Sequence, residues 1–431
     1  MGYGLAALNK LAGSALLDRF GARKQVERTV LKATRGGFKA GGAANRAFIS
    51  VRKLTAPARL PSAPDTGMFD VTPGEEQAMI QQTVLEFAEE QLRPAAAQAN
   101  ENAAAPEKLF ATAAELGITL LNVPEELGGI GTERSAVTTV LVAEALAQGD
   151  MGLAVAVLAP SAVASALALW GDAGQQSTYL PAFMADNPPA AALAVAEPTP
   201  LFDPFRLSTK AYRSGDGFTI SGVKSLVPRV GQDELFLIAA EIDGRGPALF
   251  LVESGSAGLT VAADPSMGLR AAGLGTVHLE AVKVPATALL SEGSSEMYAE
   301  MIRLSRLGWA ALAAGTARAV LDYVTPYVNE RVAFGEPISH RQGVAFKVAD
   351  IAIELEGLRL LTYRAAALAE RGKPFAREVA LARKLAVDKG MAIGSDGVQL
   401  LGGHGFTKEH PVERWYRDLR VIGLAEGVVL A

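Results

Sequence analysis

The chain has 431 residues and a net charge of −5, with 49% hydrophobic and 20% charged residues, a balance that excludes a disordered protein. That length exceeds one ordinary hydrophobic core, so two or three packed subdomains are expected. The absence of cysteine excludes disulfides, thiolate metal sites and cysteine nucleophiles.

Charge is distributed unevenly along the chain. Residues 1–65 hold 12 Lys and Arg against three Asp and Glu, a net +9, which leaves −14 for the remainder. A segment rich in Arg, Ala, Gly and Ser is typical of a transit peptide, of a basic arm on anionic lipid or on a partner, and of a helical arm packed on its own protein. We predict a basic extension with a linker over residues 1–66. We expect a cytoplasmic protein with potential membrane-surface contact through residues 1–65, and take the mitochondrial matrix as the alternative.

Residues 67–190 are predicted to form a helical domain. The run TPGEEQAMIQQTVLEFAEEQLRP, which begins at Thr72, has early acidic residues and an apolar repeat at three-to-four spacing. Pro94 is expected to end this helix.

Residues 151–170 contain no charged side chain over a length that could span a membrane. Pro160 in the middle, many alanines, and the flanking Asp150 and Asp172 argue against a span. Two buried helices that meet at the proline are predicted instead.

The period of the apolar residues changes to two between residues 191 and 296. Alternating runs occur at 218–221, 235–238, 248–252 and 276–284, separated by Gly, Asp and Pro. They predict a small antiparallel β domain. No helix of useful length separates the strands, so a parallel dinucleotide-binding sheet is not expected.

Residues 297–431 return to the helical period. One seam has steps of four and three residues: Val344, Val348, Ile351, Leu355, Leu358, Leu361, Ala365 and Leu368. Such a seam is typical of a long helix in a bundle. The order of helices, β domain and helical bundle predicts an α+β multidomain protein.

The short motifs of nucleotide phosphate loops, Rossmann folds, zincins and serine hydrolases are missing from the sequence. Longer runs are informative: RVAFGEPISHRQGVAFKVADIAIELEGLRLLTYRAA (331–366), VQLLGGHGFTKEHPVERWYRDLRV (398–421), VPEELGGIGT (123–132) and the Glu197-Pro198 turn. In order and spacing they resemble the acyl-CoA dehydrogenase family over residues 68–431.

This resemblance implies an N-terminal helical domain, a central antiparallel β barrel and a C-terminal four-helix bundle. It also implies FAD bound between domains and across a subunit interface, in a homo- or hetero-oligomer built as a dimer of dimers. The expected partners are an acyl-CoA substrate and an electron-transfer flavoprotein, and no nucleic acid.

The family reaction removes the α-proton of an acyl thioester while the β-hydrogen leaves as hydride to the flavin. A carboxylate in a dry pocket suits the base. Relatives carry it in a Glu-Gly step after an Arg-Asp pair, and Glu426-Gly427 after Arg417-Asp418 matches that spacing. Ser305 occupies the family's other base position, and Arg306 matches an arginine near the base, which we assign to substrate binding.

The resemblance also assigns cofactor-binding positions. Those that contact the FAD diphosphate and adenosine of a neighbouring subunit are Arg331, Phe334, Gln342, Gln399, Gly402 and Gly403. Arginine suits a diphosphate by charge and bidentate geometry, and paired glycines let the backbone approach it. The β-domain positions depart from the family pattern: Ala196, Leu226 and Pro228 stand where relatives carry a threonine, a tryptophan and a second threonine, and proline offers no donor.

Three interpretations remain open. The first is a working dehydrogenase, and the second is a catalytically weak paralogue that lends half of a FAD site to a homologous partner in a hetero-oligomer. The third is a flavin-dependent oxidase or monooxygenase on the same fold. The histidines His278, His340, His404 and His410 lack the i, i+4 spacing of a helical metal site, so no metal is predicted.

Overall fold

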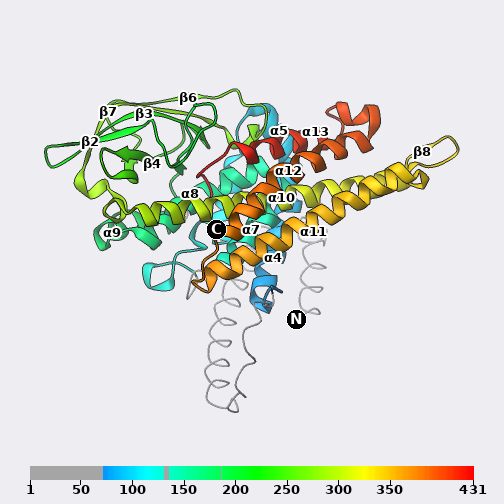
Figure 1. The fold of residues 1–431 in the computed structure, drawn as a ribbon, viewed down its shortest axis with the longest axis horizontal. Helices are drawn as coiled ribbons and strands as arrows, with labels where there is room; N and C mark the ends of the chain where they lie inside the picture. The colour runs from blue at the N-terminus through cyan, green and yellow to red at the C-terminus, as the bar shows by residue number, and fades with distance from the viewer. Residues whose placement is uncertain (1–70, 131–134, 186) are drawn as a thin grey trace, which may run out of the picture. The chain divides into compact units, whose positions relative to one another are not determined.

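The structure is a computed structural model that describes residues 71–130, 135–185 and 187–431 (Figure 1). Residues 71–431 belong to one compact unit. The predictions for the basic extension and linker, including the membrane contact of residues 1–65, lie outside the described residues.

The first part of this unit is helical, as predicted. Its helices are α4 (Glu75–Phe87), α5 (Arg93–Asn102), α6 (Glu107–Glu115), α7 (Ala136–Gly149), α8 (Met151–Trp170) and α9 (Ala173–Phe183). The prediction that Pro94 ends the first helix is wrong. A π-helical turn, Ala88–Leu92, joins α4 to α5, and Pro94 lies in the first turn of α5, where a missing N–H costs little.

The apolar segment forms the single continuous helix α8, so the prediction of two helices meeting at Pro160 is also wrong. Within the described part of the chain, α8 is the one helix long and apolar enough to cross a membrane, but 89% of its apolar window is buried inside the protein. A proline inside a helix costs about 3 kcal/mol. Burial of nearly every side chain on both sides of Pro160 offsets that cost.

The middle of the chain forms a curled seven-stranded sheet. Its strands are β1 (Ala191–Ala194), β2 (Lys210–Ser214), β3 (Gly217–Val227), β4 (Leu235–Ile242), β5 (Gly246–Glu253), β6 (Leu259–Ala263) and β7 (Gly275–Pro285). The four predicted runs all lie in strands. The sheet is mixed rather than purely antiparallel, because β1 and β2 each pair in parallel with β4.

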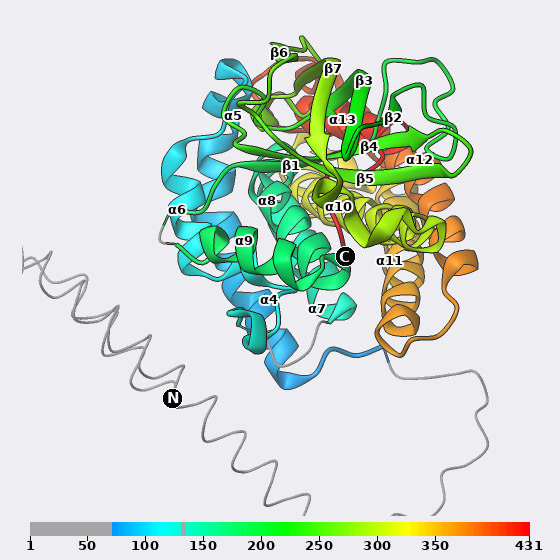
Figure 2. The same cartoon turned by 90° about the vertical axis from the view of Figure 1, so that its left-hand side faces the viewer.

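Alternation along the strands gives the sheet two buried faces. One face holds its own core, which includes Phe236 and Phe250, while the alternate residues Leu235 and Leu237 join the core of the helices. Figure 2 shows the sheet lying over α8 and α10.

The last part is a helical bundle, again as predicted. It contains α10 (Ser295–Glu330), α11 (Gln342–Glu370), α12 (Ala376–Leu400) and the short α13 (Val412–Leu419), with a small hairpin, β8 (Val332–Ala333) and β9 (Glu336–Pro337), after α10. The predicted seam of α11 is confirmed, because its residues are buried or packed against the main core. The boundaries drawn at 66/67, 190/191 and 296/297 stay predictions.

Candidate active site

Glu426, the predicted base, follows a 3₁₀ turn, Arg420–Gly423, and its side chain is only 8% exposed. Arg306 on α10 donates from Nε to both carboxylate oxygens at 3.0 Å and from Nη2 to Oε1 at 2.8 Å. Arg383 on α12 donates to the Ala425 carbonyl at 2.7 Å, and its Nη2 lies 3.5 Å from Oε1. Two arginines from two helices therefore orient this carboxylate.

The backbone after Glu426 is held from two sides. The Gly427 carbonyl accepts hydrogen bonds from the buried side chains of Ser305 at 2.7 Å and Trp309 at 2.9 Å, both on α10. On the other side, the Val428 N–H donates to the Leu193 carbonyl of β1. Val428 has φ = 70°, a left-handed value that a β-branched residue rarely adopts. Packing from both sides enforces the turn that presents Glu426.

This turn joins the base to the β domain. Gly427 forms an antiparallel bridge with Ala194, the last residue of β1, so Glu426 lies close to the loop that starts at Ala196. Tyr298 of α10 is buried here and donates to the Pro204 carbonyl at 2.8 Å. Burial raises the pKa of Tyr298 well above its usual value, and the charges of Glu426 and Glu197 add to the effect.

The predicted β-domain cofactor positions come together in the structure. The Ala196 carbonyl accepts a hydrogen bond from Ser225, the neighbour of Leu226, and Pro228 follows directly after β3. A bulge interrupts β3 here, and Leu226 has φ = 56°. Bulges re-aim side chains beside active sites. None of the three predicted residues offers a side-chain donor.

A buried ion pair lies next to these positions. The Lys224 side chain is fully buried, and its Nζ lies 2.9 Å from Glu197 Oε1 and 3.2 Å from the Val195 carbonyl. Glu197 also accepts from the backbone N–H groups of Ser208 and Thr209. Burial lowers the pKa of Lys224 to about 8, although the Glu197 carboxylate opposes that shift. The pair fixes the loop that begins at Ala196.

The bundle carries a separate pocket of about 770 Å³ at the far end of α10. Its lining comes from the end of α10, the β8–β9 hairpin, the start of α11 and the end of α12: Tyr327, Arg331, Ala333, Phe334, Ile338, Arg341, Val344, Gln399, Leu400, Leu401, Gly402, Gly403 and His404. Five of the six predicted bundle positions therefore line one cavity. Gln342 is exposed and lies beside the lining residue Arg341 rather than in the lining.

The two predicted half-sites lie far apart within one chain. Arg306, beside Glu426, and Arg331, in the pocket, are separated by about two thirds of the continuous helix α10. At 1.5 Å per residue, the 25 steps from Arg306 to Arg331 make about 38 Å along the helix axis. This is farther than one flavin dinucleotide can span. The pocket of a chain therefore cannot serve the Glu426 of the same chain.

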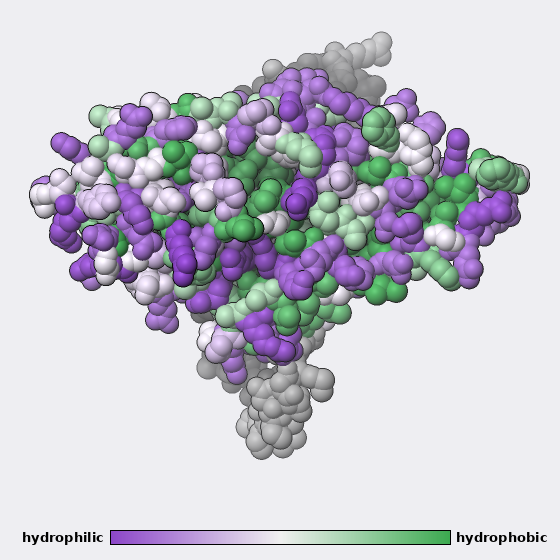
Figure 3. Space-filling model, turned by 45° about the horizontal axis from the view of Figure 1, so that its top comes forward, coloured by the Kyte–Doolittle hydropathy of each residue, from purple (hydrophilic) through white to green (hydrophobic). Residues whose placement is uncertain are grey.

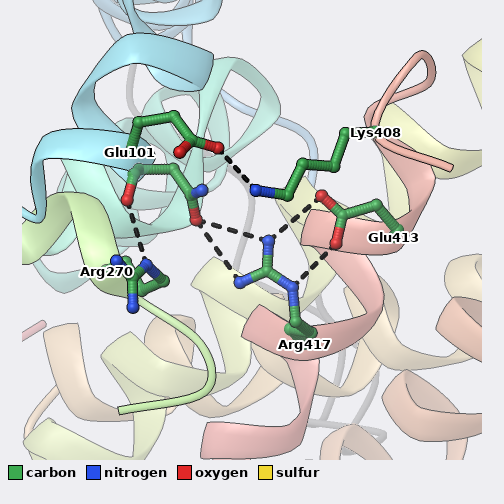
Figure 4. A pocket seen from close by; sticks show the side chains of 6 residues that line it. Glu101, Arg270, Lys408, Glu413 and Arg417 are labelled. Atoms are coloured by element: carbon green, nitrogen blue, oxygen red, sulfur yellow. Dashed lines mark hydrogen bonds and ion pairs between the residues drawn. The ribbon is translucent and has the colours of Figure 1, made fainter. Parts of the chain in front are cut away.

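A smaller cavity of about 350 Å³ marks where the three parts of the chain meet (Figure 4). Arg417 of α13 donates to Glu413 at 2.8 Å and to the Asn100 side chain of α5 at 3.3 Å, while Arg270 donates to the Asn100 carbonyl at 3.0 Å. Lys408 pairs with Glu101 at 2.7 Å. Lys408 and Arg417 are paired with carboxylates and Arg270 with a backbone carbonyl, which indicates an interlock of segments rather than a ligand site.

Beneath this interlock, Asp418 is fully buried and accepts a hydrogen bond from the Leu269 N–H at 2.6 Å. Burial, with the added repulsion of the Asp150 carboxylate, raises the pKa of Asp418 to about 7. Arg414 pairs with Asp150 at 2.9 Å. The raised pKa makes the folded state bind a proton that the unfolded chain releases near pH ~4.

This raised pKa predicts a pH-dependent stability difference. Between about pH 4 and pH 7 the unfolded chain is ionised at Asp418 and the folded chain is not, so stability falls as pH rises through that window. As the pH rises from about 4 to 7, we expect the free energy of unfolding of the native protein to decrease relative to that of Asp418→Asn. The amide oxygen of this variant still accepts a hydrogen bond from the Leu269 N–H. Urea unfolding of both proteins at several pH values measures the difference, and a constant difference would show that Asp418 is ionised throughout.

Residue-by-residue reasoning from the sequence missed several side chains of these sites. Arg341 could have been found, because it stands beside Gln342 in the run that carried the prediction. Arg383 and Tyr298 had no such signal, since only packing brings them to Glu426.

Comparison with known proteins accounts for this arrangement. The chain matches the family models described as acyl-CoA dehydrogenase N-terminal domain over residues 74–187, middle domain over residues 192–282 and C-terminal domain over residues 295–428.

Among the relatives, the short/branched chain specific acyl-CoA dehydrogenase, mitochondrial, of Rattus norvegicus is 34% identical, over 82% of this chain and 83% of its own length. A probable acyl-CoA dehydrogenase of Bacillus subtilis is 31% identical, over 83% of this chain and 96% of its own length. The solved structure of butyryl-CoA dehydrogenase from Megasphaera elsdenii superposes with a TM-score of 0.76 at 28% identity. The match covers 83% of this chain and 96% of that structure's chain. The chain belongs to the acyl-CoA dehydrogenase family of FAD-dependent oxidoreductases.

Proposed function

We propose that this chain catalyses the α,β-desaturation of an acyl-CoA thioester, with Glu426 as the base, FAD as the hydride acceptor and an electron-transfer flavoprotein as the oxidant. The observation that carries the proposal is the buried carboxylate of Glu426, oriented by Arg306 and Arg383 where the bundle meets the end of β1. Such a carboxylate, shielded from water, is the group that the α-proton requires.

The two carboxylate oxygens of Glu426 differ in their contacts. Oε1 accepts from Arg306 Nε and Nη2 and lies near Arg383, whereas Oε2 contacts Arg306 Nε alone. A carboxylate oxygen has two lone-pair directions, so Oε2 keeps one for an incoming proton. We assign proton removal to Oε2. The Gly427 carbonyl, which accepts two hydrogen bonds, and the two arginines hold this atom in place.

The residues of the bundle pocket fit the diphosphate end of FAD. Arg331 and Arg341 bring two guanidinium groups to one cavity. Gly402, with φ = 57° and open space where a Cβ would lie, lets the backbone approach a phosphate group. In the β domain, backbone groups near Ala196 and Leu226 would have to hold the ring. When bound, FAD supplies the acceptor for the hydride that leaves the substrate β-carbon.

The separation of the two half-sites supports an oligomer, because a flavin in the pocket of one chain must face the Glu426 of another. Exposed apolar side chains are available for such an assembly. Phe346, Ile353 and Leu360 repeat every seven residues on α11 and are between 57% and 68% exposed, and Phe334 at the hairpin is 96% exposed. Figure 3 shows hydrophobic surface around this hairpin. We infer a second copy of this chain as the partner.

A second candidate function rests on the contrast between the half-sites. The bundle pocket retains its arginines and glycines, while Ala196, Leu226 and Pro228 offer no side-chain donor to a flavin. A paralogue that lends its pocket to a homologous partner, within a hetero-oligomer, would show this contrast. The third interpretation, an oxidase or monooxygenase, has no observation in its favour.

One preparation separates these candidates. We expect the purified chain to be yellow, with flavin absorbance, and to be oligomeric by light scattering. Anaerobic addition of acyl-CoAs of graded length should bleach the flavin. A colourless preparation that gains flavin only when a homologue is co-expressed would instead support the lending paralogue.

Arg331 offers a direct test of the pocket. Loss of one charge-assisted hydrogen bond costs about 1.5–3 kcal/mol, so Arg331→Gln should weaken FAD binding by about 10- to 100-fold. Titration of flavin-stripped protein with FAD, followed by fluorescence quenching, measures the change. Arg377→Gln is the matched control, because Arg377 lies on α12 and its side chain is 81% exposed. Equal affinities in both variants would place the diphosphate elsewhere.

The names of relatives bear on location and on the electron acceptor. The rat relative is named as mitochondrial, which supports the matrix alternative, whereas the cytoplasmic location stays a prediction. A solved structure from a study of the electron transferring flavoprotein of Acidaminococcus fermentans has a TM-score of 0.77 at 29% identity, over 83% of this chain and 96% of its own. It supports the proposed acceptor.

A further inference from the structure

We propose that His404, Glu409 and His410 form a binding site for a divalent transition-metal ion, with Zn²⁺ as the ion that fits best. One ligand atom from each residue lies within 4.8 Å of the other two. His404 belongs to the 3₁₀ turn Gly402–Phe406, and the other two residues stand in the loop that leads into α13.

The spacing of the donor atoms suits a small tetrahedral ion. Zn²⁺ binds nitrogen and oxygen donors at about 2.0–2.1 Å, so two donors in a tetrahedral shell lie about 3.3 Å apart. The distance between His404 Nδ1 and Glu409 Oε2 is 3.5 Å. Both side chains are at least half exposed, which lets them close around an ion at little packing cost and leaves room for a coordinating water.

His410 is held in an orientation that leaves one nitrogen available. The Tyr323 hydroxyl lies 2.6 Å from His410 Nδ1, and in the tautomer that donates Nδ1–H to this hydroxyl oxygen, Nε2 keeps its lone pair for a metal. Edge-on contacts with Tyr323, Tyr327 and His404 fix the plane of the ring. Metal-binding histidines are commonly oriented in this way by a partner on the other ring nitrogen.

The donor set selects the class of ion. Two imidazoles and one carboxylate favour Zn²⁺, Ni²⁺ or Co²⁺ over Mg²⁺ and Ca²⁺, which prefer oxygen ligands. The sequence led us to expect no metal because no histidine pair has helical i, i+4 spacing. That criterion does not detect His404 and His410, because they stand six positions apart in a turn and a loop rather than on one helix.

The site lies at the rim of the bundle pocket, since His404 and Tyr327 also line that cavity. A bound ion would tie the turn that carries Gly402 and Gly403 to the loop before α13. It would also add positive charge beside the arginines of the pocket. The inference depends on these side chains alone and not on dehydrogenase activity.

The test is a titration of the full chain with Zn²⁺, using protein that carries no polyhistidine tag and has been dialysed against a chelator. We expect one saturable site per chain by calorimetry and, with Co²⁺, the strong visible absorbance of a tetrahedral complex. His404→Asn and His410→Asn should each abolish saturable binding. Tyr323→Phe, which removes only the orienting hydroxyl, should weaken it by about 10- to 100-fold.

The two other histidines provide matched controls. His278→Asn and His340→Asn change the same residue type on β7 and before α11, and they should bind Zn²⁺ like the native protein. The alternative explanation, a simple ion pair between His404 and Glu409, predicts no saturable binding. That outcome, or binding that survives both His404→Asn and His410→Asn, would overturn the proposal.

Discussion

Replacing Glu426 with glutamine is expected to lower the rate of flavin bleaching by acyl-CoA by about 100- to 10,000-fold, the range that a positioned general base contributes. Glutamine keeps the size of the side chain and can still accept hydrogen bonds from Arg306, but it does not take up the α-proton. Substrate binding should persist. Stopped-flow absorbance under anaerobic, saturating acyl-CoA measures the rate, and the spectral shift on mixing reports binding.

The control for this experiment is Glu356→Gln, the same substitution on the exposed surface of α11, where Glu356 pairs with Arg318. It should bleach at the native rate. If Glu426→Gln also bleached at the native rate, the base would be another residue. If the native chain held flavin and showed no bleaching with any acyl-CoA, the dehydrogenase proposal itself would be wrong.

Replacing Lys224 with methionine is expected to destabilise the protein by about 3–5 kcal/mol, the usual cost of removing one partner from a buried ion pair. Methionine fills nearly the same volume, so the loss comes from charge rather than from a cavity. Glu197 would keep two backbone donors but lose the ammonium 2.9 Å away. Urea unfolding at pH 7 measures the change in the free energy of unfolding.

The double variant Lys224→Met with Glu197→Gln separates the two possible causes of this loss. Because it leaves no unpaired charge in the interior, it should recover most of the stability lost in Lys224→Met. A double variant as unstable as the single one would show that packing around Lys224, not charge, is responsible. Flavin content of both variants reports whether the loop at Ala196 needs the ion pair.

Local patterns along the chain were enough to predict most of the architecture. The seam of α11 and the strand runs at 218–221 and 276–284 were found from periodicity, since each residue's burial follows directly from the repeat of its helix or strand. The prolines were misjudged for the opposite reason. Local chemistry disfavours a proline within a helix, but tertiary burial around Pro160 and the π-helical turn before Pro94 overcome that preference.

The sequence by itself determined the order of the helices and strands, the family motifs and the position of Glu426, because these depend on residues close together along the chain. Only the tertiary structure decided what surrounds Glu426: Arg383 approaches it from 43 residues away and Arg306 from 120. The same holds for the separation of the two half-sites and for the His404, Glu409 and His410 cluster. Distances between side chains depend on how helices pack and loops turn, and the spacing of residues along a chain does not specify them.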